Sequence, residues 1–342
     1  MKNNLNIQIF NNEENIMMKQ LKKPNKEPKP LISIIIPTHN CLEYLPKAIE
    51  SIFNQRVNNI EILIIDDNSN DGTWQWLQKQ QEKHSQIRPY RLHGVGAARS
   101  RNFALKRVKA DLIAFLDADD FWHNNKLIKQ YRFHRDNPNV VLSFTNYHHT
   151  TPDNVDLGDC FQYWPHFKQL VKNDSNFHFL DQPTEKIYSE NVIGTSCVMI
   201  KTKTYKLIGG FDHKLKSAED WDLWLRFSKF GKVAYCNDEL MEYLVRPNSE
   251  TSDRLRRLDQ MQIIMKRYRA YVRRHNIWSV FQADGRIEVG YAEHFAEQKQ
   301  FMRAFWHQLK GLVLNPSIRN LKASIAFVWH SLQQKYKSKS AV

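Results

Sequence analysis

The sequence of 342 residues has few cysteines and no long apolar run. Its four cysteines are widely spaced and form no C-x-x-C pair, which argues against a zinc knuckle or a redox dithiol. This favours a reduced cytoplasmic setting without excluding a disulfide. The apolar runs at 31–36 and 62–65 are far shorter than the roughly 20 residues that cross a bilayer. The first 30 residues lack the apolar core of a secretory signal. We therefore expect a cytoplasmic protein without a membrane span.

Acidic residues are scarce in the last part of the chain. The formal net charge is +14, and from Thr251 to the end 17 Lys/Arg stand against 6 Asp/Glu, a net +11. Residues 1–250 carry 33 against 30, a net +3. An anionic membrane surface would suit this excess, and so would a solvated basic helical surface. No recognition motif for nucleic acid is present, so we expect no nucleic-acid partner.

The order of apolar patterns predicts an α/β fold with a mostly parallel, Rossmann-like sheet. The pattern predicts a flexible tail over 1–29, a catalytic domain over 30–250 and a basic helical region over 251–342, with the boundary at 249–253. Pro37 is expected to stop the first strand and Asp71 to cap a helix. Strands are expected at 31–36, 60–65, 90–92, 112–116 and 140–144, and helices at 45–55, 71–83, 97–108 and 126–135.

Polar residues gather where the predicted strands end. His39 follows the first strand, Asp66 and Asp67 follow the second, and Asp117 and Asp119 follow the strand at 112–116. Ligands bind beyond the carboxyl ends of a parallel sheet, so these residues predict a binding site there. Residues i and i+2 of an extended chain point to the same side. Asp117 and Asp119 could therefore hold one hard cation, Mg²⁺ or Mn²⁺, although a D-x-D pattern alone is weak.

Six segments, in order, resemble the signatures of family 2 glycosyltransferases of the GT-A fold. Together they span about residues 30–230, and they match the family's nucleotide, Gly-rich, metal and acceptor-side signatures. The segments are Ser33–Asn40 (SIIIPTHN), Ile64–Thr73 (IIDDNSNDGT), Gly94–Asn102 (GVGAARSRN), Ala114–Asp120 (AFLDADD), Gly209–Asp212 (GGFD) and Ala218–Arg226 (AEDWDLWLR).

The resemblance implies a role for each matching residue on the donor side. It implies that the nucleoside pocket is lined by Pro37, Thr38 and His39. Asp67, with Asp66 as the alternative, would bond the polar edge of the base. Arg101, with Arg99 as its rival, would lie near the base or the diphosphate. Asp117 would reach the ribose or the metal, and Asp119 would coordinate the metal.

On the acceptor side, the resemblance implies that Asp220 is the general base and that Glu219 helps to orient the acceptor. Asp220 opens a predicted helix, whose N-terminus favours the charged carboxylate and so weakens it as a base. The alternative for Asp220 is a helix cap. Arg246 stands where many relatives have a metal-reaching histidine, so we expect it to contact the diphosphate instead.

The motifs together predict an inverting, metal-dependent glycosyltransferase. Its expected donor is a nucleotide-sugar, UDP-linked in similar enzymes, and its expected acceptor is a hydroxyl of a glycan or lipid-linked precursor of bacterial surface polysaccharide or lipopolysaccharide. The Gln-x-x-Arg-Trp motif of processive synthases is missing, which favours single additions. The alternative is a catalytically inactive nucleotide- or glycan-binding protein of the same fold. A nicotinamide dehydrogenase is excluded because no G-x-G-x-x-G follows the first strand.

The C-terminal segment predicts an amphipathic helix after Asn315-Pro316, a pair typical of a helix start. Ile318, Leu321, Ile325, Val328 and Leu332 would form its apolar stripe, among basic residues. Such a helix would either lie on the inner face of the cytoplasmic membrane as a peripheral contact or pack on the catalytic domain.

Overall fold

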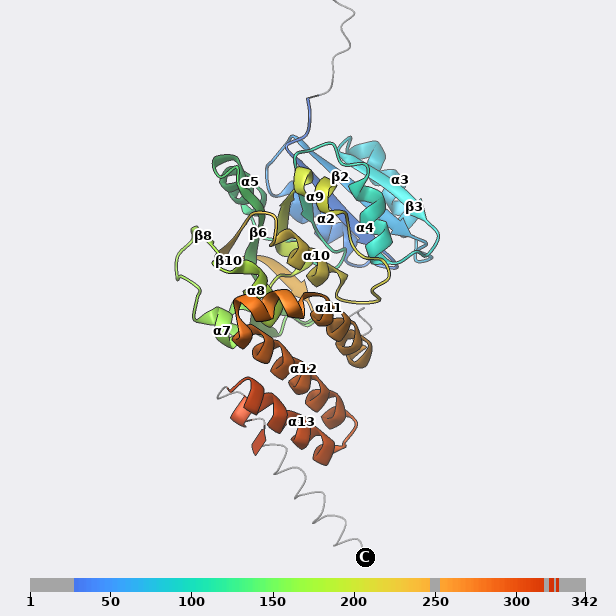
Figure 1. The fold of residues 1–342 in the computed structure, drawn as a ribbon. Helices are drawn as coiled ribbons and strands as arrows, with labels where there is room; N and C mark the ends of the chain where they lie inside the picture. The colour runs from blue at the N-terminus through green and yellow to red at the C-terminus, as the bar shows by residue number, and fades with distance from the viewer. Residues whose placement is uncertain (1–27, 247–252, 317–319, 323, 326–342) are drawn as a thin grey trace, which may run out of the picture.

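The fold is built on one mixed sheet flanked by helices (Figure 1). The computed structural model describes residues 28–246, 253–316, 320–322 and 324–325. The strand order is β3-β2-β1-β4-β9-β6-β10-β5, with β7 paired to β6 and β8 paired to β10. The strands are β1 (Ile32–Thr38), β2 (Ile60–Asp67), β3 (Ile87–Leu92), β4 (Leu112–Phe115), β5 (Phe121–Trp122), β6 (Val140–Thr150), β7 (Asp156–Asp159), β8 (Phe177–Phe179), β9 (Val198–Lys201) and β10 (Lys232–Leu244).

The first four strands of the chain, β1 to β4, pair in parallel with one another, as predicted. β1 pairs in parallel with β2 and β4, and β2 pairs in parallel with β3. β1 and β2 are buried along their whole length, as β-branched runs covered on both faces should be. The carboxyl ends of these strands therefore lie along one edge of the sheet, which is where the predicted site residues stand.

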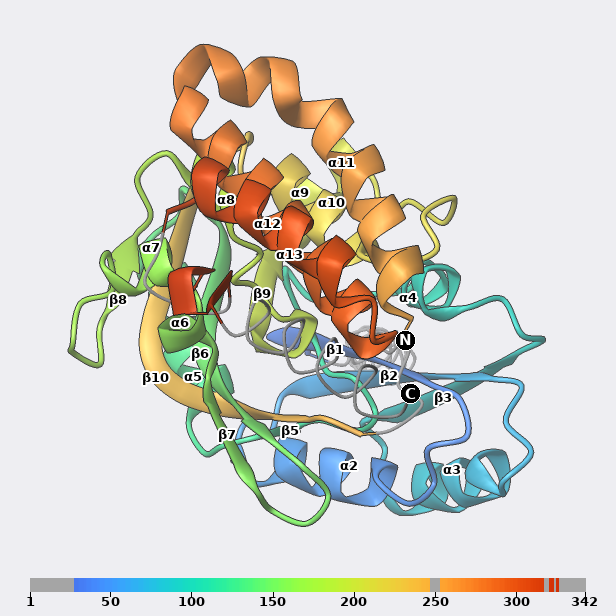
Figure 2. The ribbon, with the colours of Figure 1, turned by 90° about the horizontal axis from the view of Figure 1, so that it is seen from below.

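Helices cover both faces of the sheet. In Figure 2, α2 and α3 lie on one face, and α4, α9 and α10 lie on the other. The helices are α2 (Leu45–Phe53), α3 (Thr73–Lys83), α4 (Ala97–Leu105), α5 (Lys126–Asp136), α6 (Cys160–Tyr163), α7 (Pro165–Lys168), α8 (Pro183–Ser189), α9 (Thr202–Ile208), α10 (Glu219–Phe227), α11 (Arg254–His275), α12 (Ile277–Glu297) and α13 (Phe301–Leu314), with a 3₁₀ turn η1 (Thr195–Cys197).

Several predicted boundaries were wrong by one to a few residues. Pro37 does not stop β1, because pairing with β4 has already ended at Ile35 and only β2 runs beside the proline. A proline is tolerated where a strand has one partner. The N-cap of α3 is Gly72, at φ 93°, and not Asp71. The Asp71 carboxylate still accepts hydrogen bonds from the Thr73 amide and hydroxyl. It therefore gives a backbone amide of the first helical turn a partner, although it stands one residue before the N-cap.

The C-terminal helices are attached to the sheet domain through α8 and α10. The Tyr268 hydroxyl of α11 donates to the Asp222 carboxylate of α10, and the Tyr188 hydroxyl of α8 donates to the Met265 carbonyl. α12 and α13 then pack as a hairpin that extends away from the sheet (Figure 1). Among the described residues, no helix has the length and apolarity to cross a bilayer. The predicted C-terminal helical region is confirmed over the described residues, and the division at residue 250 stays a prediction.

The predicted amphipathic helix lies mostly outside the described residues. Of its apolar stripe, the structure describes Leu321 and Ile325, and both are exposed. Asn315 is the C-cap of α13, and the Asn320 side-chain amide donates to its carbonyl.

Candidate active site

The predicted donor residues lie at the carboxyl ends of β1, β2 and β4, the edge seen from below in Figure 2. Pro37 and Thr38 end β1, and both are buried. The Thr38 hydroxyl has no hydrogen-bond partner within the protein, although it is buried. A buried polar atom without a partner is costly, so this hydroxyl is available to a ligand or a water molecule.

His39 is exposed at the start of the loop after β1. Its Nδ1 lies 2.8 Å from the carbonyl oxygen of Asp67, so Nδ1 must carry the proton of this hydrogen bond. The side-chain amide of Asn40 lies 3.2 Å from Nε2, which then acts as the acceptor. These two contacts orient the exposed imidazole at the rim of the site.

Asp67 has a role that the sequence did not reveal. Its Oδ1 accepts the backbone amides of Gly94 and Val95 at 2.9 and 2.8 Å, and its Oδ2 accepts the amide of Gly96 at 2.6 Å. Gly94 and Gly96 both have positive φ, 80° and 86°, which fold the chain around the carboxylate. Asp67 therefore stabilises the turn before α4. A contact between Asp67 and the base of a nucleotide stays a prediction.

Arg101, on α4, joins the predicted donor and acceptor sides of the site. Its guanidinium donates to Asp117 Oδ1 at 2.6 Å and to Glu219 Oε1 at 3.0 Å. Arg101 is buried, which opposes its charge, yet the two carboxylates raise its pKa above the ordinary arginine value. Its rival Arg99 is exposed, so Arg101 is the arginine that reaches the acidic residues.

Asp119 is paired with Arg246, which follows β10, and the predicted contact of Arg246 with a diphosphate stays a prediction. The Arg246 Nε donates to Asp119 Oδ2 at 2.6 Å, and the guanidinium lies 5.5 Å from the centre of the Tyr44 ring. Asp119 and Arg246 both keep part of their side chains open to solvent. Arg246 is thus beside the metal motif, where a cationic side chain could meet a diphosphate.

The acidic residues could hold a metal ion only together with ligands that a bound substrate supplies. The described part of the chain contains no group of three or more Asp, Glu, His or Cys side chains arranged to hold a metal. Mg²⁺ is commonly held by one or two carboxylates together with substrate phosphates. Asp117 and Asp119 supply such a pair, so a cation here would be completed by phosphate oxygens of the donor. In the structure Asp117 pairs with Arg101 and Asp119 pairs with Arg246. A cation would compete with these arginines for the carboxylates.

Ser196 is a site residue that sequence reasoning missed. Its hydroxyl donates to the buried Asp120 carboxyl and accepts the backbone amide of Asp117 at 3.0 Å. Burial, with Asp119 and Asp117 nearby, raises the pKa of Asp120 well above its usual range. Ser196 therefore fixes the backbone of the acidic motif from 79 residues away along the chain. No local pattern in the sequence marks it.

Asp220 lies at the start of α10, next in sequence to Glu219, which Arg101 contacts. Its Oδ2 accepts the Thr195 hydroxyl at 2.9 Å and its Oδ1 accepts the amide of Trp221 at 2.7 Å. Burial raises the pKa of Asp220, while these hydrogen bonds and Arg101 lower it by less. The expectation that the helix N-terminus makes Asp220 a weaker base was wrong in direction, because desolvation outweighs the stabilisation of the charge. A raised pKa suits a general base near neutral pH.

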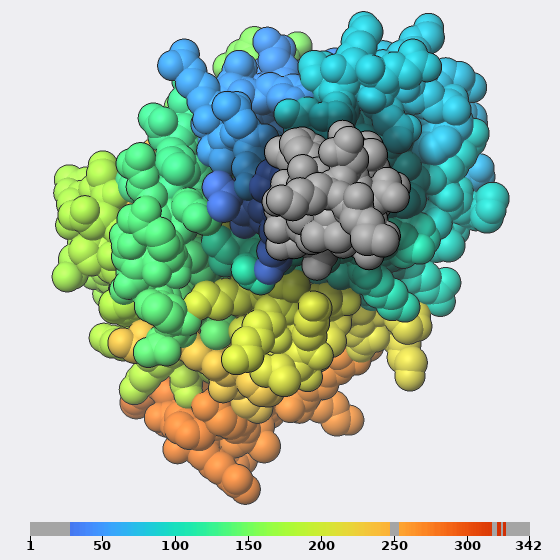
Figure 3. Space-filling model, turned by 90° about the horizontal axis from the view of Figure 1, so that it is seen from above, coloured from blue at the N-terminus to red at the C-terminus, as the bar shows by residue number. Residues whose placement is uncertain are grey.

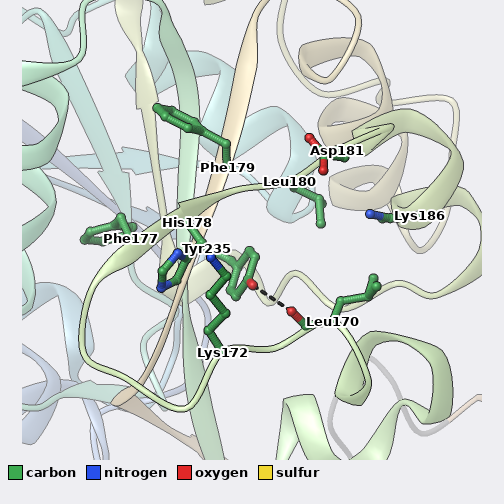
Figure 4. A pocket seen from close by; sticks show the side chains of 9 residues that line it. All are labelled: Leu170, Lys172, Phe177, His178, Phe179, Leu180, Asp181, Lys186 and Tyr235. Carbon is green, nitrogen blue, oxygen red and sulfur yellow. Dashed lines mark hydrogen bonds between the residues drawn. The ribbon is translucent and has the colours of Figure 1, made fainter.

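A separate pocket lies between β8, β10 and the start of α8 (Figure 4). It has a volume of about 380 Å³, and the Tyr235 hydroxyl donates to the Leu170 carbonyl at its wall. Its lining residues are Leu170, Lys172, Phe177, His178, Phe179, Leu180, Asp181, Lys186 and Tyr235. Tyr235 stands well before the carboxyl end of β10, where Arg246 follows. None of the predicted site residues lines this pocket.

Comparison with known proteins places the fold and the strand-end residues in one family. Residues 33–200 match the family model described as glycosyl transferase family 2. The putative teichuronic acid biosynthesis glycosyltransferase TuaG of Bacillus subtilis is 32% identical over 228 residues, which cover 66% of this chain and 83% of that protein. The chain belongs to glycosyltransferase family 2. It is therefore a glycosyltransferase with a GT-A-like fold, as the resemblance implied.

Two further proteins extend the comparison. WfaP of Escherichia coli, a UDP-Glc:alpha-D-GlcNAc-diphosphoundecaprenol β-1,3-glucosyltransferase, is 40% identical over 118 residues, 34% of this chain and 46% of that protein. The mannosyltransferase PcManGT of Pyrobaculum calidifontis, solved with GDP-Man and Mn²⁺, has a TM-score of 0.60 at 15% identity over 95% of this chain and 88% of that one. At that identity the second likeness supports the fold alone.

Proposed function

We propose that this glycosyltransferase inverts the anomeric centre and requires a divalent cation. Its proposed donor is a UDP-linked sugar, and its proposed acceptor is a hydroxyl of a glycan or lipid-linked intermediate in bacterial surface polysaccharide or lipopolysaccharide synthesis. The names of TuaG and WfaP support this class of acceptor, and the name of WfaP supports UDP. The proposed location is the cytoplasm, at the inner face of the cytoplasmic membrane.

The observation that carries the proposal is the Arg101 bridge. One guanidinium contacts Asp117 at the donor edge and Glu219 beside Asp220, so both halves of a transfer reaction meet in one polar site. A site that only bound a nucleotide would not need a partly buried carboxylate with a raised pKa across from the acidic motif.

The proposed reaction moves one proton and exchanges one glycosidic bond. Asp220 accepts the proton of the acceptor hydroxyl as its oxygen attacks the anomeric carbon from the face opposite the nucleotide. The bond from that carbon to the β-phosphate oxygen breaks, and the diphosphate leaves with the electron pair. Arg246 and Arg101 are the cationic groups placed to stabilise that charge. A cation held by Asp117 and Asp119 would neutralise the same charge.

Product stereochemistry tests the inverting mechanism. Proton NMR of the product formed from an α-linked UDP-sugar should show a β-linkage at the earliest time points. An α-linked product would contradict a single displacement assisted by Asp220. A protein that binds donor with no turnover would be the inactive homologue instead.

A further inference from the structure

α13 has two faces of different character. Ala304, Gln308 and Gly311 are buried against α12, and a Cβ added at Gly311 would lie 2.8 Å from a methyl group of Val289. On the opposite side, Met302, Trp306 and Val313 are 52%, 57% and 74% exposed. The three recur at helical spacing and form one outward row. We call Met302, Trp306 and Val313 the outer stripe of α13.

No acidic residue follows Glu297. Residues 298–342 contain eight Lys/Arg and no Asp or Glu. Of these, Arg303 and Lys310 are exposed on α13 itself, and Lys322 is exposed just beyond it. The outer stripe is therefore apolar and contains a tryptophan, and α13 itself carries Arg303 and Lys310 but no Asp or Glu.

The acidic residues of the neighbouring helix α12 are already paired. Glu293 and Glu297 accept from Arg254 of α11, and Glu288 pairs with His307 on α13 at 2.6 Å. Asp284 pairs with Arg269. These carboxylates therefore have partners within the helical region, and the Lys and Arg side chains of α13 itself, Arg303 and Lys310, stay on its exposed surface.

α13 is on the side of the molecule where the parallel strands end. Figure 3 shows the opposite face of the molecule, seen from above. Figure 2, seen from below, shows α13 in front, over the edge where the parallel strands end. A surface that met α13 would therefore face the side of the donor edge.

We propose that the outer stripe of α13, with Arg303 and Lys310, docks on an anionic lipid bilayer. Tryptophan and methionine insert at the boundary of headgroups and acyl chains, and lysine and arginine attract acidic headgroups. This deepens the proposed function, on which it rests for the lipid-linked acceptor, by naming the surface that brings the enzyme to it. Docking is measurable without turnover, so the two proposals fail separately.

The test is co-sedimentation of the full chain with vesicles of phosphatidylcholine alone or with a third of phosphatidylglycerol. Wild type should sediment with the anionic vesicles and be released by high salt. Trp306→Ser with Lys310→Glu should weaken binding by about tenfold or more. The matched control is Leu207→Ser with Lys206→Glu, an exposed pair on α9, which should bind as wild type. Met302→Ser with Arg303→Glu is a second variant, used if the first does not fold.

Three results would overturn the proposal. One is wild-type protein that stays in the supernatant with anionic vesicles. Another is an equal loss of binding in the α9 control, which would indicate a nonspecific charge effect. The third is light scattering that gives a wild-type dimer and a monomeric α13 variant, because the outer stripe would then be a subunit interface. An enzyme that sediments but does not turn over any donor would contradict the proposed function alone.

Discussion

Asp220 is the residue on which the proposed chemistry depends most. Asp220→Asn keeps the size of the side chain and removes its capacity to take a proton. We expect transfer to fall by about 10²–10⁴-fold, the usual effect of losing a positioned base. Donor affinity should stay unchanged, because the donor residues stand at the ends of β1, β2 and β4. Rate assays, a donor titration and a thermal melt measure the three effects.

The alternative for Asp220, a helix cap, gives a different result. Loss of a cap would cost roughly 1 kcal/mol of unfolding free energy and leave turnover nearly intact. A stable, donor-binding and fully active Asp220→Asn enzyme would end the assignment. Glu219, which already pairs with Arg101, would then be the next carboxylate to test.

Thr195 is the hydrogen-bond partner that lowers the pKa of Asp220 most. Its hydroxyl donates to Asp220 Oδ2 and lowers the pKa of that carboxyl, against the larger rise caused by burial. A base works only when unprotonated, so activity should fall as the pH drops through its raised pKa. Thr195→Val removes the hydrogen bond and should move this acid limb of kcat/KM to higher pH. Thr195→Ser keeps the hydroxyl and should keep the wild-type profile; identical profiles for both variants would exclude the role.

The sequence located the acidic residues but not the groups that orient them. Asp117, Asp119 and Asp220 belong to local motifs, so their positions at strand and helix ends could be predicted from pattern alone. Thr195 and Ser196 reach them from the turn η1, and only the tertiary fold brings that turn to the site. The direction of the Asp220 pKa was missed for the same reason, because burial depends on long-range packing.

The turn between β3 and α4 depends on one carboxylate. Asp67 accepts three backbone amides from residues 94–96, and an asparagine could accept them with only one of its two side-chain atoms. Asp67→Asn should therefore lower the free energy of unfolding by about 1–3 kcal/mol and weaken donor binding. Asp111→Asn, at an exposed position, is the matched control and should change stability by no more than about 0.5 kcal/mol. Denaturant unfolding that gives equal values for the two variants would contradict this role.

Elements with strong periodicity were predicted best. The buried strands β1, β2 and β4 and the helices between them followed from apolar runs and spacing, with errors at their ends. The antiparallel β9, which separates β4 from β6, was not predicted. Its short run Val198–Lys201 takes its place through pairing with strands far away in the sequence, and local pattern does not encode such pairing.

The two ion pairs between the acidic motif and the arginines raise the question of whether turnover by the enzyme requires a metal ion. Arg101 and Arg246 each neutralise one carboxylate of the acidic motif. If a cation completed by donor phosphates takes their place, EDTA should abolish turnover and Mn²⁺ or Mg²⁺ should restore it. Asp119→Ala should stay folded and lose the stabilisation that metal adds to donor binding in a thermal melt. Full activity in chelator would instead indicate that the arginines alone stabilise the departing diphosphate.

The uneven charge of the chain has a structural counterpart. Among the described C-terminal helices the basic excess lies on α11, with eight Lys/Arg against one Asp, whereas residues 277–314 of the α12–α13 hairpin hold four of each sign. The strand-end site is made of residues from the nearly neutral part. Composition alone could indicate the asymmetry, but it could not show that the apolar row of α13 faces outward. That depended on the close approach of Gly285 and Gly311, which sets the rotation of α13 against α12.

The central claim is that the edge formed by β1, β2 and β4 binds a nucleotide-sugar and activates it for transfer. Release of nucleoside diphosphate from a panel of UDP-, GDP- and dTDP-sugars, measured with Mn²⁺ and with a thermal melt of the same samples, tests it most directly. The structure and the family predict that at least one UDP-sugar raises the melting temperature and is turned over, and that Arg101→Met loses both effects. A panel in which no nucleotide-sugar shifts the melt or releases its diphosphate would contradict the claim.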